Sequence, residues 1–301
     1  MSYYIGIDIG GTNIKAIAVD ESGVLKRESS QPTRDGEFDG DTPLFAKGAQ
    51  KVVENLENDF GQPALGIGIS APGLAARDSR SIFCIPGKMH GLENLDWTTF
   101  FKRDPVVPVL NDAHAALLGE AWVGAAAGKE NVVMLTIGTG VGGAIICDGH
   151  LLKGHIGRAG HLGHTTVGAD LIPDVSGVPG GLEMSISETF IDKINNPKFT
   201  STKALADAYK AGDEEGSRLW IESVRRFAVA IASIVNAVDP EIVIIGGGGI
   251  KAGDALFKPL QAFMDEYEWR PDGHRVQIVE AKLDSIAGAY GAAKAALDDL
   301  K

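Results

Sequence analysis

Short apolar runs, most of them followed by glycine, alternate along the chain with stretches whose apolar residues recur every three or four positions. The apolar runs predict β-strands, at 3–9, 14–19, 64–70, 106–110, 131–137, 144–147, 242–245 and 276–279. A further short strand is expected from Val24. The helical spacing predicts α-helices, at 42–60, 113–123, 217–238, 254–267 and 285–297. Strands that alternate with helices indicate an α/β fold.

Two parts of the chain, about half its length apart, show the same order of elements. In each, a strand leads through a glycine turn into a second strand that ends at an acidic turn. The two glycine turns are Gly10-Gly11-Thr12 and Gly138-Thr139-Gly140. Similarity at this separation predicts two related lobes. Because no polar low-complexity linker separates them, we expect compact crossings between the lobes and a shared cleft.

The charge and cysteine content exclude several classes of protein. The 28 Lys and Arg residues stand against 40 Asp and Glu, a net charge of −12. Such a surface repels phosphate backbones and anionic lipid. No apolar run approaches the ~20 residues of a membrane span, no export signal is evident at the N-terminus, and Cys84 and Cys147 cannot form a disulfide framework. We expect a cytoplasmic protein without nucleic-acid or membrane partners.

Glycine is abundant, with 39 residues, and it concentrates at the ends of predicted strands. Asp8 ends the first strand beside the turn Gly10-Gly11-Thr12. Backbone N–H groups of such a turn can cradle phosphate, Thr12 can add a hydroxyl, and Asp8 can hold Mg²⁺ directly or through water. Lys15 adds positive charge nearby. A simple hairpin in which Asp8 caps the turn fits these residues equally well.

Two further glycine loops could also bind parts of a ligand. The loop 138–143, with the hydroxyls of Thr136 and Thr139, can hold phosphate, and the loop 246–249 can let a base or ribose lie against the backbone. Each loop alone is equally compatible with a tight packing turn. Together they favour a nucleotide, and the candidate residues are Thr136, Gly138, Thr139, Gly140, Gly246, Gly247, Gly248 and Gly249.

Asn111-Asp112 stands between a predicted strand and a predicted helix. Either residue can cap the helix. A carboxylate at this place is also suited to act as general base for a hydroxyl nucleophile, and the pair can grip neighbouring hydroxyls of a polyol.

Three histidines, His155, His161 and His164, lie in a glycine-rich stretch upstream of Glu183. Such a set can bind zinc, but the spacing is not of the HExxH type, which favours a polar loop.

Five of these segments, in this order and spacing, resemble the ROK family of sugar kinases along essentially the whole chain. The resemblance is to glucokinase- and fructokinase-like members. It covers the first phosphate loop with Lys15, a substrate-side turn, the catalytic segment, the second phosphate loop and the adenosine loop. These segments are, in that order, 8–12, 71–73, 111–113, 136–143 and 245–249.

The resemblance implies a two-lobed, actin-like (ribonuclease H-like) α/β fold with a cleft between the lobes. The N-terminal lobe would comprise 1–115 and 285–301, and the C-terminal lobe 116–284. It also implies an ATP-dependent hexose kinase that uses Mg²⁺ and forms a homodimer. Asp112 would be the general base, and Asn111 and Gly73 would bind the sugar.

The chain departs from the family pattern in two places. His161 stands where the family usually has a sugar-binding Glu, whereas His164 and Glu183 match family sugar ligands. The family's zinc-binding cysteines fall on Asp174, Ser176 and Gly181, so we expect no zinc. Two alternatives stay open. The donor can be polyphosphate, or the chain can be a sugar-responsive regulator, although the first strand leaves no room for the DNA-binding segment that precedes such members.

Overall fold

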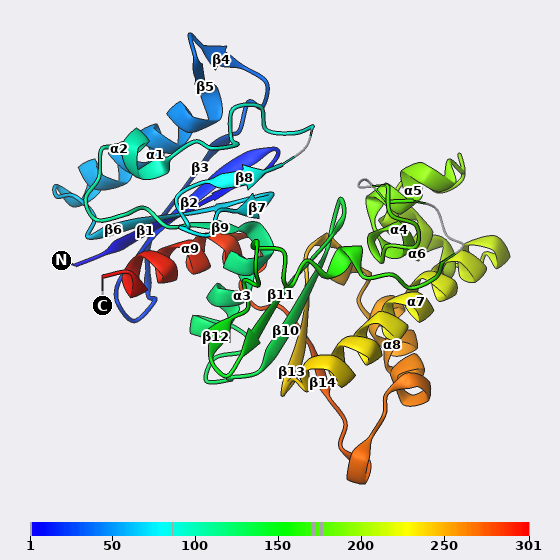
Figure 1. Ribbon diagram of the computed structural model, residues 1–301. Helices are drawn as coiled ribbons and strands as arrows, with labels where there is room; N and C mark the ends of the chain where they lie inside the picture. The colour runs from blue at the N-terminus through cyan, green and yellow to red at the C-terminus, as the bar shows by residue number, and fades with distance from the viewer. Residues whose placement is uncertain (1, 86, 170–172, 175–176, 301) are drawn as a thin grey trace. The chain divides into compact units, whose positions relative to one another are not determined.

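The computed structural model describes residues 2–85, 87–169, 173–174 and 177–300 (Figure 1). The chain divides into two compact units. Unit 1 comprises Met1–Gly128, Lys153–Ala159 and Lys282–Lys301, and unit 2 comprises Lys129–Leu152 and Gly160–Ala281. The predicted lobe boundary after residue 115 therefore falls inside helix α3 (Asp112–Val123), all of which belongs to unit 1.

Unit 1 is built on a five-stranded sheet in the order β3-β2-β1-β6-β9. The pairs β1–β2 and β2–β3 are antiparallel, and β1–β6 and β6–β9 are parallel. The strands are β1 (Tyr4–Ile9), β2 (Asn13–Val19), β3 (Leu25–Pro32), β6 (Gly66–Ala71) and β9 (Val109–Asn111). Every residue of β6 is buried, as expected for a strand covered on both faces.

Unit 2 repeats this plan. Its sheet has the order β12-β11-β10-β13-β14, again with antiparallel pairs on one side of the central strand and parallel pairs on the other. The strands are β10 (Val132–Ile137), β11 (Val141–Cys147), β12 (His150–Leu151), β13 (Ile242–Gly246) and β14 (Gln277–Glu280). The internal repeat predicted from the two glycine hairpins is thus confirmed.

Helices cover both sheets. Those of unit 1 are α1 (Leu44–Phe60), α2 (Trp97–Phe101), α3, η4 (Asp284–Ile286) and α9 (Ala287–Asp298). Those of unit 2 are η1 (Leu162–His164), α4 (Glu183–Ile186), α5 (Glu188–Ile194), α6 (Thr202–Lys210), α7 (Glu214–Val238), η2 (Gly248–Ala252), α8 (Asp254–Tyr267) and η3 (Pro271–Gly273). Two small hairpins pair β4 (Phe38–Asp39) with β5 (Thr42–Pro43) and β7 (Leu74–Ala75) with β8 (Ile82–Cys84).

The structure corrects two details of the sequence analysis. The second glycine turn is shorter than predicted, because Gly142 and Gly143 lie within β11 and pair with β10. The long helix α7 begins at Glu214, three residues before the predicted start, since the Asp213 side chain accepts a hydrogen bond from Gly216 N and caps it there. Along the described part of the chain, no helix combines the length and the apolar character that crossing a membrane requires.

The last helix, α9, packs directly on β1 and β6 of unit 1 (red in Figure 1). Glycines make this close approach possible. A Cβ added at Gly68 would overlap the backbone of Ala292, and one added at Gly6 would overlap that of Ala289. The same helix touches α3, where a Cβ at Gly291 would overlap the Ala115 carbonyl group.

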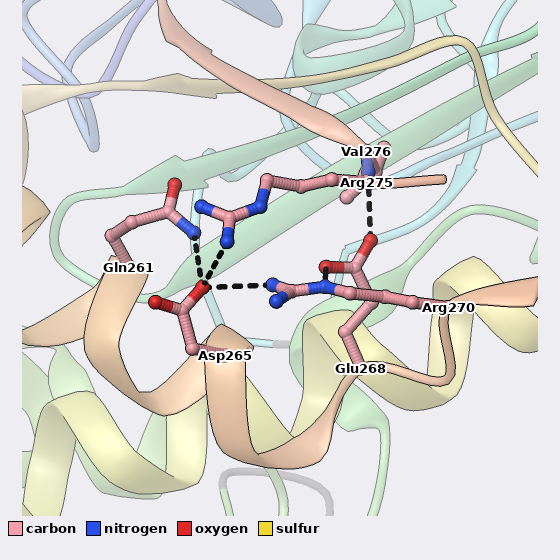
Figure 2. Close-up of polar contacts among 6 residues, drawn as sticks. All are labelled: Gln261, Asp265, Glu268, Arg270, Arg275 and Val276. Atoms are coloured by element: carbon pink, nitrogen blue, oxygen red, sulfur yellow. Dashed lines mark hydrogen bonds and ion pairs between the residues drawn. The ribbon is translucent and has the colours of Figure 1, made fainter. Parts of the chain in front are cut away.

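A network of charged side chains anchors the segment between α8 and β14 in unit 2 (Figure 2). Glu268, whose side chain is buried, accepts hydrogen bonds from Val276 N at 2.7 Å and from Arg270 Nε at 2.8 Å. Asp265 Oδ1 lies 2.9 Å from guanidinium nitrogens of both Arg270 and Arg275. These contacts fix the approach of the chain to the edge strand β14.

Gly68→Ala is expected to lower the free energy of unfolding by about 1–3 kcal/mol, because an overpacked methyl group pushes α9 away from the sheet. Gly66→Ala on the same strand is the matched control. Its Cβ would lie 3.2 Å from the Ala296 carbonyl oxygen, a tight contact that small shifts can relieve. Urea denaturation measures both variants, and equal losses of stability would contradict the close-approach argument.

Candidate functional site

Asp8, near the end of β1 in unit 1, is a half-buried carboxylate beside the first glycine turn. It pairs in register with Ser70 of β6, whose hydroxyl donates to Asp8 Oδ1 at 2.6 Å. Burial raises the pKa of Asp8 to about 6; the Ser70 hydrogen bond opposes this rise and the nearby Asp112 carboxylate adds to it. Across the hairpin, Lys15 faces Asp8 in register and donates to the Ser285 carbonyl oxygen at 3.2 Å.

The N-terminal end of α9 closes over these two side chains. A Cβ at Gly288 would lie 2.6 Å from Asp8 Oδ1 and 2.8 Å from Ser70 Oγ. Only glycine at this position leaves room for the pair.

The first glycine turn is only partly free to hold a ligand. Gly10 N donates to the Asn13 carbonyl oxygen at 3.0 Å and so closes the hairpin. Gly11 and Thr12 are exposed, and a Cβ at Gly11 would meet no atom within 4 Å. Of the three predicted turn residues, Gly11 and Thr12 are therefore the ones placed to contact phosphate.

Asn111 and Asp112 have different roles at the start of α3. Asn111 caps the helix, because its Oδ1 accepts from the backbone N–H groups of Ala113 at 3.0 Å and His114 at 3.2 Å. Its Nδ2 donates to the Gly73 carbonyl oxygen at 2.9 Å, which ties the predicted substrate-side turn to the helix. Asp112 is exposed at the first position of the helix, but desolvation by the surrounding protein atoms raises the pKa of its carboxyl group. The capping role thus belongs to Asn111.

The Asp8 carboxylate offers oxygen ligands of the kind that Mg²⁺ prefers. It is half-buried, accepts a hydrogen bond from Ser70 and lies near the Asp112 carboxylate, so a bound cation would offset the unfavourable negative charge at this place. The residues present therefore fit the metal that the family resemblance implies.

Unit 2 holds a cavity of about 380 Å³ beside the second glycine turn. Its lining combines an apolar floor from Ile137, Ala252 and Leu256 with polar groups at the rim. Four of the predicted nucleotide residues line it: Gly138, Thr139, Gly248 and Gly249. The other predicted residues support its walls without lining it. Thr136 pairs in register with Gly246, and Gly247 has a positive φ of 79° and packs against Ile137.

Sequence analysis missed helix α6, which forms one wall of this cavity through Thr202, Lys203 and Asp207. Lys203 Nζ lies 2.5 Å from Asp207 Oδ2. The sequence signal that could have predicted this helix is Ser201. Its side chain accepts a hydrogen bond from Ala204 N at 3.0 Å and caps the helix.

Glu183 lies beneath the second glycine turn. It is buried at the start of α4, where its Oε2 accepts from Val141 N at 3.4 Å. A Cβ at Gly140 would overlap this carboxylate, so glycine at 140 lets the turn lie on Glu183.

The three histidines of the glycine-rich stretch are divided between the two units. His155 belongs to a segment of unit 1, whereas His161 and His164 belong to unit 2. His164 Nδ1 forms a hydrogen bond of 2.8 Å with Asp174 Oδ2. Among the described residues, no three His, Cys, Asp or Glu side chains converge in a metal-binding group. Ser176, one of the three positions of the family's zinc cysteines, lies outside the described residues.

Comparisons with known proteins show which family the chain resembles. The model of the ROK family matches residues 4–299. The chain is 32% identical to a glucokinase of Halalkalibacterium halodurans, over 96% of this chain and 93% of that protein. The ROK hexokinase of Thermus thermophilus matches with a TM-score of 0.83 and 27% identity over 99% of both chains. A ROK glucokinase of Streptomyces griseus, solved with glucose and AMPPNP, matches with a TM-score of 0.77 and 26% identity over 99% of this chain and 100% of that one.

A regulator is also among the relatives. A xylose repressor of Caldicellulosiruptor bescii is 26% identical over 98% of this chain and 78% of its own length. The predicted two-lobed, actin-like α/β fold is confirmed by the structural matches.

Ser70→Ala is expected to raise the pKa of Asp8 further, by about one pH unit, since a hydrogen bond to a charged group contributes about 1.5 kcal/mol. Carboxyl ¹³C NMR titration measures this change. The control is Ser185→Ala, a buried serine of unit 2 whose hydroxyl has no hydrogen-bond partner among the described residues. An unchanged Asp8 titration in Ser70→Ala would show that the Ser70 hydroxyl does not stabilise the carboxylate.

Proposed function

The chain belongs to the ROK family, and we propose that it transfers the γ-phosphoryl group of ATP to a hydroxyl of a hexose or hexose derivative. The observation that carries the proposal is the placement of Asp112. It stands at the N-terminal end of α3, close enough to Asp8 for its carboxylate to raise the pKa of Asp8, while the neighbouring Asn111 performs the structural task of capping the helix.

Asp112 is proposed to accept the proton of the sugar hydroxyl as that hydroxyl attacks the γ-phosphate. Its raised pKa suits Asp112 to this task, because it makes the carboxylate a stronger base than one with the ordinary pKa. Asn111 would orient the sugar through its second amide hydrogen, with Gly73 beside it. His161, His164 and Glu183 of unit 2 are proposed as further sugar contacts.

The cavity of unit 2 supports ATP as donor. Its apolar floor and the glycine backbone at Gly248 and Gly249 suit a flat base and a ribose. Polyphosphate carries neither group and would leave this floor without a partner. The hydroxyl of Thr139 and the glycine turn around it would face the phosphates.

Asp8 would hold Mg²⁺, directly or through water. The ion, when bound, neutralises phosphate charge during the transfer. This chain favours the ionised form of Asp8 through the hydrogen bond from Ser70, and glycine at 288 leaves room for the carboxylate.

A sugar-responsive regulator is the second candidate function, and the repressor relative is the observation that favours it. The net charge of −12 opposes binding to DNA. A filter-binding assay at low salt decides this point, since tight DNA binding together with absent turnover would favour the regulator.

Asp112→Asn is expected to lower kcat by about 10²–10⁴-fold, the usual contribution of a positioned general base. Nucleotide affinity and stability should stay near those of the unaltered protein. The assay follows ADP release over a panel of hexoses and hexose derivatives, with inorganic polyphosphate compared as donor by sugar-phosphate formation. Asp41→Asn, an exposed aspartate of the same unit, is the matched control.

Two outcomes of this assay would overturn the proposal. If no sugar on the panel is phosphorylated from either donor, the kinase function is wrong. If Asp112→Asn turns over as fast as Asp41→Asn, the assignment of the base is wrong.

The pH dependence provides a separate test of the base. Because Asp112 must be ionised to accept a proton, and because its pKa is raised from the ordinary 3.8, activity should fall as the pH drops while still above that value. The raised pKa of Asp8, about 6 before any metal binds, acts in the same direction. The acid limb of the kcat/KM profile measures this, and a limb at or below pH 3.8 would contradict the assignment.

A further inference from the structure

We propose that Asp174 is a positioning residue that fixes the ring orientation and tautomer of His164, so that His164 Nε2 accepts a hydrogen bond from a sugar hydroxyl. This inference rests on the proposed function, because it takes His164 to be a sugar contact. Its physical basis is the difference in solvent exposure between the two side chains. The Asp174 side chain is 0% exposed, and that of His164 is 48% exposed.

Asp174 is held rigidly by its own backbone and side chain. Asp174 N donates to the Val178 carbonyl oxygen at 2.8 Å, and Gly177 N donates to the Asp174 carbonyl oxygen at 3.0 Å. Asp174 Oδ1 accepts from Val178 N at 3.1 Å. The other oxygen, Oδ2, is directed at His164 Nδ1 at 2.8 Å. One carboxylate oxygen thus accepts a hydrogen bond within the turn, and the other forms a hydrogen bond with the histidine.

The segment that carries His164 is fixed to the same turn region. Leu182 N donates to the Thr165 carbonyl oxygen at 2.9 Å, and Val167 N donates to the Gly180 carbonyl oxygen at 2.8 Å. A Cβ at Gly181 would lie 3.1 Å from Asp174 Oδ2, so glycine at this position leaves room for the carboxylate. Backbone hydrogen bonds of both segments therefore fix the distance between His164 and Asp174.

The hydrogen bond between Asp174 and His164 determines whether Nε2 of His164 is a hydrogen-bond donor or acceptor. An ionised carboxylate only accepts hydrogen bonds, so Nδ1 must carry a hydrogen. In the neutral ring Nε2 is then an acceptor. Because the ring is half exposed, this acceptor is open to a ligand, and a sugar hydroxyl is the matching donor. Carboxylates that orient a functional histidine in this way typically contribute 10–100-fold to affinity or activity.

The decisive variant is Asp174→Asn. The amide oxygen can still accept from Val178 N, which leaves the NH₂ group facing His164 Nδ1. That group donates, so Nδ1 becomes the acceptor, Nε2 carries the hydrogen, and the outward polarity of the ring is reversed. We expect the KM for sugar to rise about 10–100-fold, with the KM for ATP unchanged. Asp192→Asn, an exposed aspartate on α5 with the same loss of charge, should leave both values unchanged.

A double-mutant cycle separates positioning from general structural support. If Asp174 acts through His164, Asp174→Asn adds less than about twofold to the sugar KM once His164→Gln is present. Effects that multiply fully would overturn the proposal, as would a sugar KM in Asp174→Asn equal to that of Asp192→Asn.

The tautomer itself can be measured without any turnover. Long-range ¹⁵N–¹H correlation spectra of the seven histidines, with His164 assigned from the His164→Gln spectrum, should show Nδ1–H in the unaltered protein and Nε2–H in Asp174→Asn. An Nε2–H tautomer in the unaltered protein overturns the proposal even if Asp174→Asn does not fold. Failure of the proposed function is distinct, because it appears as absent phosphorylation of every sugar by the unaltered protein.

Discussion

The close packing of α9 on the first sheet is the constraint on which unit 1 depends. This helix comes from the end of the chain, yet it lies against β1 and β6 at its centre. Glycines at 6 and 68 remove the side chains that would keep it at a distance, and Gly288 brings its first turn against Asp8 and Ser70. Packing of the core and the partial burial of the Asp8 carboxylate therefore have the same cause. A larger residue at 288 would have to displace either the helix or the carboxylate.

The repeated sheet explains where the candidate residues gather. In parallel strands the carboxyl ends meet at one edge, and loops at that edge commonly bind ligands. In unit 1 the strands β1, β6 and β9 lead into Gly10, Gly73 and Asp112. In unit 2 the strands β10 and β13 lead into the turns that begin at Gly138 and Gly247. The same topology thus carries acidic groups in one unit and a glycine-lined cavity in the other.

Much of this arrangement was predictable from the sequence, because it depends on short-range signals. Strand runs, glycine turns and the cap at Asn111 are visible within a few residues, and the order of five motifs indicated the family. Contacts between distant segments were not predictable. Helix α6 was missed as a cavity wall, as was the hydrogen bond to Glu183 from Val141 N, 42 residues away. The pairing of Asp174 with His164 likewise depends on backbone contacts across the loop between them.

The hydrogen-bond donors around Glu120 show what a purely structural acid looks like in this protein. Glu120 is fully buried, but its oxygens accept from the backbone N–H groups of Ala125, Lys282 and Leu283, at 2.6, 2.9 and 2.7 Å. These donors stabilise its charge, so Glu120 holds two distant segments together and has little capacity left for a proton or a ligand. Asp112 differs, because the residue is exposed at the start of α3, and desolvation by the surrounding protein nevertheless raises its pKa. Asp174 stands between these cases, because one oxygen accepts from the backbone of its own turn and the other is directed at a histidine. The groups that already hold a carboxylate, and not its burial alone, therefore decide what else that carboxylate can do.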